Sequence, residues 1–188
     1  MEAFVSCLLQ NGRFDQEQLA SIKNRLVRQT IPKGGYFSEA GKVARQVGFN
    51  TRGVFRVCTY NKEGEEFTRA FIDENRFIVD YNSFINEIPC GAYVQALTDC
   101  ELHVIERADF IELSAAVPDW QPTISRIMFS TMMRKVSDAG LMLSCDARQR
   151  YVNFLERYPG IVNRIPLSAL ASYLGITQSS LSRIRKNL

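Results

Sequence analysis

The stretch RIPLSALASYLGITQSSLSRIRK, residues Arg164–Lys186, decides the fold of the C-terminal part of the chain. At helical spacing, an apolar stripe along residues 167–174 predicts a first helix. Gly175 ends that helix, because a residue without a Cβ can adopt the left-handed conformation that turns the chain. Thr177 is a good N-cap for a second helix, which buries Leu181 and Ile184. Two short helices joined by a tight turn predict a helix-turn-helix.

The exposed face of the second helix predicts contact with DNA. Its side chains are amides, hydroxyls and cations, which read base edges and bind phosphates; they are Gln178, Ser179, Ser182, Arg183, Arg185 and Lys186. The same pattern also fits an ordinary helical hairpin with a solvated face. That alternative is less favoured, because a merely solvated helix usually mixes both signs of charge and this face has no acidic residue.

The charge of the chain is divided unevenly along its length. The net charge is +3 overall, but residues 148–188 hold seven basic residues and one acid. Residues 1–147 hold sixteen basic and nineteen acidic residues, so they are net acidic. The asymmetry indicates that the last fifth of the chain meets a polyanion.

Cysteine usage and hydropathy restrict the class of protein. The five cysteines are scattered, odd in number and without a CxxC pair, which predicts neither a disulfide framework nor a metal site. No secretory signal opens the chain, and no apolar run approaches about 18 residues. We therefore expect a cytoplasmic protein with no membrane partner.

The middle of the chain, from Val27 to about Arg107, has an apolar period of two. This period and the intervening turn signals, such as Asn50–Gly53, predict an antiparallel sandwich or barrel. The predicted strands are 27–31, 35–38, 43–49, 54–60, 66–72, 92–97 and 101–106. The segment DYNSFINE, Asp80–Glu87, has helical spacing and is expected as a short helix inserted between strands.

Helices are expected on both sides of the strands. Two precede them, at Glu2–Gln10 and from Asp15 to before Thr30, and a small one follows at Ala108–Ala116. A long helix then runs from Asp119 to about Leu143, and another reaches about Tyr158. The long helix carries an apolar stripe that either packs against its own domain or forms a dimer seam; its members are Ile124, Ile127, Met128, Met132 and Val136.

This organisation resembles the Crp/Fnr family of bacterial transcription regulators. The resemblance covers nearly the whole chain and is carried by ALTDCELHVI at 96–105 and RYPGIVNRIPLSALASYLGITQSSLSRIRK at 157–186. The second segment is similar to a branch common in Bacteroidetes, in which a YLGIT-x-x-x-LSRIRK ending recurs. The resemblance implies an α+β chain with a jelly-roll-like β-roll, related to cyclic-nucleotide-binding domains, over 1–118. It also implies a dimerisation helix over 119–143 and a helix-turn-helix domain over 144–188.

The resemblance assigns roles to the second helix of the helix-turn-helix. Gln178, Ser179 and Arg183 stand where family members read bases in the major groove. The expected phosphate contacts are Thr177, Ser180, Ser182, Arg185 and Lys186. Family members usually continue with a β-hairpin wing, and since the printed sequence ends at Leu188 we expect no full wing.

The resemblance also implies that the effector pocket is degenerate. Phe77-Ile78-Val79-Asp80 stands where F-I-G-E leads into the pocket helix, and Cys90-Gly91-Ala92 stands where Arg-Ser/Thr-Ala follows. Val79 places a side chain where backbone should approach closely, and Cys90 removes the cation that holds a cyclic phosphate. We therefore expect no tight binding of cyclic AMP in the usual mode. Asp80 is better explained as a helix N-cap, and Cys90 as a half-buried turn residue rather than a redox sensor.

The sequence thus predicts a DNA-binding transcription regulator and not an enzyme. We expect a homodimer on an inverted-repeat operator, with RNA polymerase as a further candidate partner and no metal or cofactor. The alternative is a small-ligand sensor that signals through protein contacts. The single histidine, His103, alternates with apolar residues in a predicted strand and offers no catalytic set.

Overall fold

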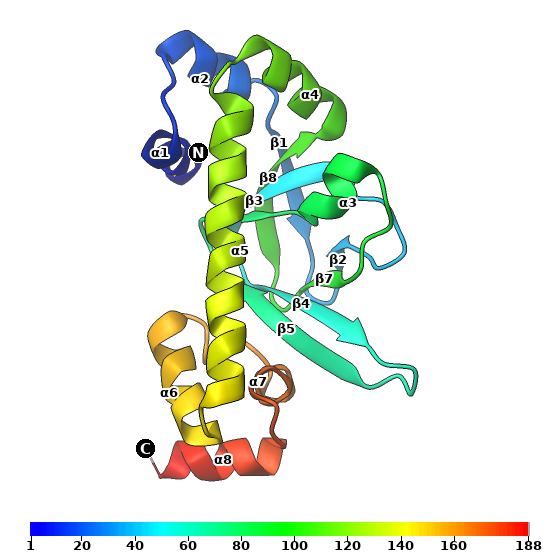
Figure 1. Cartoon of the computed structure of the whole chain (residues 1–188), viewed down its shortest axis with the longest axis vertical. Coiled ribbons are helices and arrows are strands. Elements are labelled where there is room, and N and C mark those ends of the chain that lie inside the picture. The colour runs from blue at the N-terminus through cyan, green and yellow to red at the C-terminus, as the bar shows by residue number, and fades with distance from the viewer. Residues whose placement is uncertain (188) are drawn as a thin grey trace.

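The structure is a computed structural model that describes residues 1–187. Helix α5 (Trp120–Ser144) runs the length of the molecule, with a β-roll beside its N-terminal half and a group of helices at its C-terminal end (Figure 1). This arrangement confirms the predicted α+β class with a β-roll, a long central helix and a C-terminal helix-turn-helix. Within residues 1–187, no helix combines the length and the apolarity that crossing a bilayer requires.

Two four-stranded antiparallel sheets form the β-roll. The first has the order β1 (Val27–Ile31), β8 (Cys100–Glu106), β3 (Gln46–Arg52) and β6 (Arg76–Ile78). The second has the order β2 (Tyr36–Ser38), β7 (Tyr93–Ala96), β4 (Phe55–Tyr60) and β5 (Glu66–Ile72). Their alternating apolar side chains meet in a core that includes Phe37, Phe55 and Leu102. Strand β5 is therefore an edge strand of the second sheet.

The N-terminal helices and the first half of α5 share a second core. Helices α1 (Glu2–Asn11), α2 (Gln16–Lys23), α3 (Tyr81–Asn86) and α4 (Arg107–Ala116) contribute to it, with Phe4 and Trp120 among its buried side chains. Asp15 caps α2 in a capping box, because its side chain accepts from the Gln18 amide while the Gln18 side chain accepts from the Asp15 amide. The start of α2 is therefore fixed by two reciprocal hydrogen bonds.

The remaining helices are α6 (Ala147–Arg157), α7 (Leu167–Leu174) and α8 (Gln178–Lys186). Their core also contains three residues of the β-roll, Val54, Phe71 and Leu97. The C-terminal helices are therefore docked on the β-roll as well as joined to it through α5.

Three sequence predictions for the β-roll and the N-terminal helices were wrong in detail. Strand β6 was not expected, because three residues are too few for a clear period of two; it pairs with Gly48–Asn50 of β3. Residues 50–52 were predicted as a turn, but they extend β3. The second helix ends at Lys23 and does not continue toward Thr30, because β1 begins at Val27.

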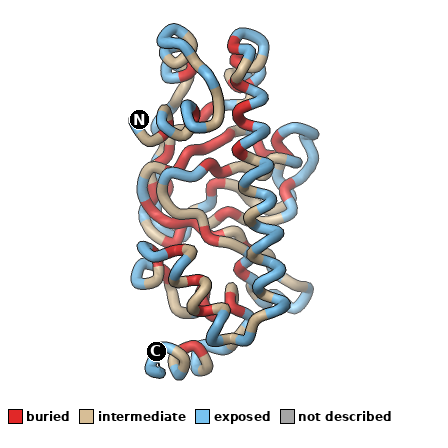
Figure 2. The backbone as a smooth tube through the Cα atoms, turned by 60° about the vertical axis from the view of Figure 1, so that its left-hand side comes forward, coloured by how far each residue is buried: buried red, intermediate tan, exposed pale blue. Residues whose placement is uncertain are grey.

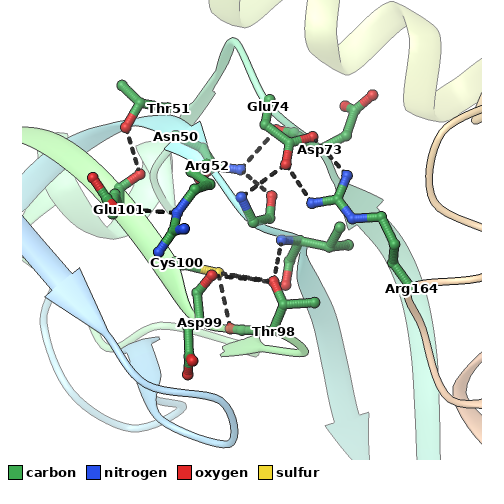
Figure 3. Close-up of polar contacts among 12 residues, drawn as sticks. Asn50, Thr51, Arg52, Asp73, Glu74, Thr98, Asp99, Cys100, Glu101 and Arg164 are labelled. Atoms are coloured by element: carbon green, nitrogen blue, oxygen red, sulfur yellow. Dashed lines mark hydrogen bonds and ion pairs between the residues drawn. The ribbon is translucent and has the colours of Figure 1, made fainter.

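Asn50 explains why a turn signal lies inside a strand. Its side chain is fully buried, and its Nδ2 donates to the carbonyl of Gly53 at 2.7 Å and to that of Asp73 at 2.9 Å (Figure 3). These two bonds tie the β3–β4 turn to the β5–β6 turn. Gly53 is required there, because its φ is +98° and a Cβ would lie 2.5 Å from the sulfur of Cys100.

Helix α7 docks on the free edge of β5, and we call this contact the β5–α7 joint. The Ser172 hydroxyl accepts from the Thr68 amide at 2.9 Å and donates to the Glu66 carbonyl at 3.1 Å. One side chain thus satisfies a donor and an acceptor that an adjacent strand would otherwise pair. The joint leaves this part of the edge closed to further strand pairing.

Aromatic side chains fill the joint beside these hydrogen bonds. The ring of Phe71 on β5 lies 5.7 Å from Phe154, 6.2 Å from Tyr158 and 5.2 Å from Tyr173. These separations and the tilted or edge-on orientations are those that aromatic pairs prefer. The Tyr158 hydroxyl also donates to the Phe71 carbonyl at 3.4 Å. Phe71 therefore anchors α6 and α7 to the sheet.

An ion pair completes the joint beside the two turns that Asn50 ties together. The Arg164 guanidinium forms two hydrogen bonds with the Glu74 carboxylate, which also accepts from the Gly53 amide at 2.8 Å (Figure 3). Partial burial acts to raise the pKa of Glu74, but the bonds from Arg164 and Gly53 outweigh it and lower the pKa. The charged carboxylate is thus the form that the fold stabilises.

We predict that Phe71→Ala lowers the free energy of unfolding by about 3–5 kcal/mol, because it removes a buried ring and leaves a cavity. Phe67→Ala on the same strand is the matched control, since Phe67 is 47% exposed whereas Phe71 is 4% exposed. It should cost less than about 1 kcal/mol. Urea unfolding of both variants measures the difference, and equal losses would contradict the anchoring role of Phe71.

We also predict that Glu74→Gln lowers stability at pH 7 by about 0.5–1.5 kcal/mol, a modest value because both partners are partly exposed. A lowered folded pKa means that this stabilisation is complete above the unfolded value of about 4.3 and is lost as the pH falls through the folded pKa. The gap to wild type should therefore close in acid. Urea unfolding between pH 7 and pH 3, with exposed Glu63→Gln as control, tests this; a gap that does not narrow as the pH falls would refute it.

Candidate nucleic-acid interface

The helix-turn-helix forms as its sequence predicts. Gly175 has a φ of +67° and ends α7. Its amide donates to the Ser172 carbonyl at 3.2 Å, and the Ile176 amide donates to the Ala171 carbonyl at 3.0 Å. This is the Schellman pattern of bonds at a helix C-terminus. Thr177 then caps α8, because its hydroxyl accepts from the Ser180 amide at 3.2 Å.

Helix α8 has one buried side and one exposed polar side. Leu181 is fully buried against α7 and Ile184 is partly buried in the same core. Thr177, Gln178, Ser179, Arg183, Arg185 and Lys186 are exposed, and Ser180 and Ser182 are intermediate. The structure therefore brings this predicted set together on one helix at one end of the molecule (Figure 1).

Three members of the set also bond to one another at the start of the helix. The Thr177 hydroxyl lies 2.9 Å from the hydroxyls of both Ser179 and Ser180. The three hydroxyls thus form a small cluster around the first turn of α8. Amide groups at a helix N-terminus carry partial positive charge, so this end favours an anionic neighbour.

Several cations of the basic C-terminal segment are bonded within the protein, so not all of them are available to a polyanion. Arg157 pairs with Asp138 of α5 at 3.4 Å, and Arg164 pairs with Glu74 of the β-roll. Arg150 donates to the Leu174 carbonyl at 2.8 Å. Within residues 1–187, by contrast, no carboxylate lies within ion-pair distance of Arg183, Arg185 or Lys186. The cations of α8 are therefore presented to solvent, as is Arg148 of α6.

The residues of the predicted effector pocket are engaged in hydrogen bonds near the start of α3. Asp80 caps α3, as expected, and accepts from the Ser83 amide at 3.1 Å and from the Gly91 amide at 3.4 Å. Cys90 is 4% exposed, and its sulfur donates to the Ser83 hydroxyl at 3.4 Å. Val79 packs against the core of the N-terminal helices. The structure thus places Val79, Asp80, Cys90 and Gly91 together, with both oxygens of the carboxylate already engaged.

The apolar stripe of α5 divides into two parts. Ile124 and Ile127 are buried in the core shared with the N-terminal helices, and Met128 packs against that core. Met132 and Val136 are 60% and 57% exposed, and they lie beside exposed Phe129 and Met133. Figure 2 shows the same change, from buried segments in the N-terminal half of α5 to a mainly exposed C-terminal half. The first part of the stripe is occupied within the protomer, whereas the second part is not.

Several contacts that position the helix-turn-helix had no signal in the sequence. Ser172, Glu74 and Arg164 each contact residues about 90 to 106 positions away in the chain. Arg150 had been counted only as part of a basic segment. His103, for which no role was expected, lies on β8 between Arg28 of β1 and Phe49 of β3.

Comparisons with known proteins agree with this architecture. Residues 28–116 match the family model of the cyclic nucleotide-binding domain. No curated protein matches the sequence. Among solved structures, FixK2 from Bradyrhizobium japonicum is similar with a TM-score of 0.75 and 15% identity, over 87% of this chain and 84% of that chain.

Two further structures are similar over most of both chains. A transcriptional regulator from Eubacterium rectale, described as a member of the crp/fnr family, has a TM-score of 0.73 and 15% identity, over 93% of this chain and 83% of that chain. CLP from Xanthomonas campestris, described as a c-di-GMP responsive global regulator, has a TM-score of 0.71 and 16% identity, over 92% and 91%. Residues 28–116 therefore have the fold of a cyclic nucleotide-binding domain, and the chain as a whole has the fold of the Crp/Fnr regulators.

Proposed function

We propose that this protein is a sequence-specific DNA-binding transcription regulator, a binding protein and not an enzyme. The observation that carries the proposal is helix α8, which buries Leu181 and exposes amide, hydroxyl and cationic side chains together, the cations having no ion-pair partner within residues 1–187. A helix with these side chains fits the major groove of B-DNA, which is about 12 Å wide. The Crp/Fnr fold supports the same conclusion.

The exposed residues divide into two groups by their chemistry. Gln178, Ser179 and Arg183 are proposed to read base edges, since Gln pairs well with adenine and Arg with guanine. The hydroxyl and cationic residues are proposed to contact phosphates; these are Thr177, Ser180, Ser182, Arg185 and Lys186. Capping of α8 by Thr177, whose hydroxyl also donates to that of Ser180, is compatible with this role, because a hydroxyl has more than one hydrogen-bonding position.

We propose that the exposed part of α5 pairs two protomers. Phe129, Met132, Met133 and Val136 recur at spacings of three and four along the helix and are each at least 49% exposed. An exposed apolar stripe of this kind is stabilised by burial against a second copy. In the dimer, the two α8 helices would meet half-sites about 34 Å apart, which implies an inverted-repeat operator. The proposed division is a sensor domain at 1–118, a dimerisation helix at 119–143 and a DNA-binding domain at 144–188.

We further propose that cyclic AMP does not control the protein in the usual mode. Asp80 is used as the cap of α3, and Cys90 provides no cation for a phosphate. The sensor domain would therefore respond to another effector or to none. RNA polymerase is a candidate partner once the protein is bound to DNA.

We predict that Arg183→Ala weakens binding to the preferred duplex by about 1–3 kcal/mol and relaxes the preference for one base pair. Lys23→Ala is the control, because it removes the same charge from α2 at the opposite end of the molecule (Figure 1). Gel-shift titration against the preferred and single-substituted duplexes measures both effects. Wild-type affinity and preference in the Arg183 variant would contradict the proposal, and salt-independent, negligible binding by wild type would favour a sensor that signals through protein contacts.

We predict that Val136→Glu converts the dimer to a monomer, because it places a charge in an apolar seam. Ile111→Glu on α4 is the matched control, since Ile111 is 52% exposed and lies outside the stripe. It should leave the dimer intact. Sedimentation velocity distinguishes the two states. If the Val136→Glu variant remains dimeric, this stripe is not the dimer interface.

A further inference from the structure

Arg150 lies where it can control the turn before α8. It projects from α6, and its Nη1 donates to the carbonyl of Leu174, the last residue of α7, at 2.8 Å. The carbonyls at a helix C-terminus have no partner within the helix and carry partial negative charge. A guanidinium at this end therefore satisfies a carbonyl and neutralises the helix dipole at once.

The turn that Arg150 contacts is short. Only Gly175, Ile176 and Thr177 separate the end of α7 from the start of α8. A Cβ added to Gly175 would lie 3.3 Å from the Nη1 of Arg150, so the guanidinium packs directly over the left-handed residue. A change in the direction of the chain at Leu174 would move the whole of α8, because so few residues intervene.

The surroundings of Arg150 differ from those of its neighbour Arg148. The Nε of Arg150 is buried and has no hydrogen-bond partner within residues 1–187, whereas Arg148 is exposed on the same helix. Since Arg150 is partly enclosed and its Nη1 is bonded to Leu174, its charge is directed into the protein. The two arginines, only two positions apart, therefore suit different tasks.

We propose that Arg150 is a positioning residue for DNA recognition, which fixes the turn at Gly175 and hence the direction of α8, and that it does not contact phosphate. This inference rests on the proposed function, since it concerns how the recognition helix is aimed. It differs from the composition-based interpretation, in which Arg150 is one more cation for a polyanion.

The salt dependence of DNA binding separates the two roles. Each lost phosphate contact reduces the slope of log K against log[salt] by about 1. A positioning residue leaves the slope unchanged, because no counterion release is lost. We expect Arg150→Ala to weaken binding to the preferred duplex about 10-fold or more, at the slope of wild type, since a charged hydrogen bond is removed. Arg148→Ala is the matched control. It should not combine a 10-fold loss of affinity with the salt slope of wild type.

Arg150→Lys supplies a second test if the alanine variant folds poorly. Lysine keeps the charge but lacks the planar fork of donors, so we expect affinity between those of wild type and Arg150→Ala, again at the slope of wild type. A phosphate contact made by a point charge would instead be retained by lysine.

Amide hydrogen exchange tests the same inference without DNA. In the free protein, we expect the Gly175 and Ile176 amides to exchange faster in Arg150→Ala than in wild type or Arg148→Ala, because the turn loses its brace. If the wild-type protein binds no duplex but the Gly175 and Ile176 amides still exchange faster in Arg150→Ala, the proposed function fails, whereas the role of Arg150 in holding the turn is supported. A slope lower by about 1, wild-type affinity, or unchanged exchange in Arg150→Ala would each overturn the positioning role.

Discussion

The docking of α7 on the edge of β5 is the contact on which the placement of the C-terminal helices depends. An edge strand exposes unpaired amides and carbonyls, and here the Ser172 hydroxyl pairs with one of each. Burial of Phe71 among Phe154, Tyr158 and Tyr173 supplies most of the stabilisation. The burial of an aromatic ring contributes more free energy of folding than a single hydrogen bond does. The Arg164–Glu74 pair fixes the orientation of the segment before α7 but contributes little to the free energy of folding, because both side chains are partly exposed.

This docking gives helix α7 two fixed sides. Its flank is held on the β-roll through Ser172, and its C-terminus is held by Arg150 of α6. Helix α8 follows within three residues and takes its direction from these contacts. In the proposed dimer, the exposed stripe of α5 would set how two such units face one DNA duplex. Under the proposed function, DNA would be recognised by a short polar helix whose direction is set by residues that do not read bases.

Local sequence patterns predicted the helix-turn-helix and most strands, because turn residues, caps and apolar periods act over a few positions. Gly175 and Thr177 are examples, since each one's role depends on its immediate neighbours. Strand β6 escaped detection because three residues carry too little periodicity, and Asn50 resembled a turn residue although it lies in a strand. The joint could not be inferred, because nothing in the neighbourhood of Ser172 or Phe71 specifies a partner about a hundred residues away. The burial of Ile124 and Ile127 likewise depended on which elements pack beside α5.

The most direct test of the central claim is selection of duplexes by the wild-type protein from a randomised library, followed by affinity measurement between 50 and 200 mM salt. The account predicts an inverted repeat whose half-sites are about 10 base pairs apart, with affinity that falls steeply as salt rises. Enrichment of no motif, or weak binding that does not change with salt, would contradict it.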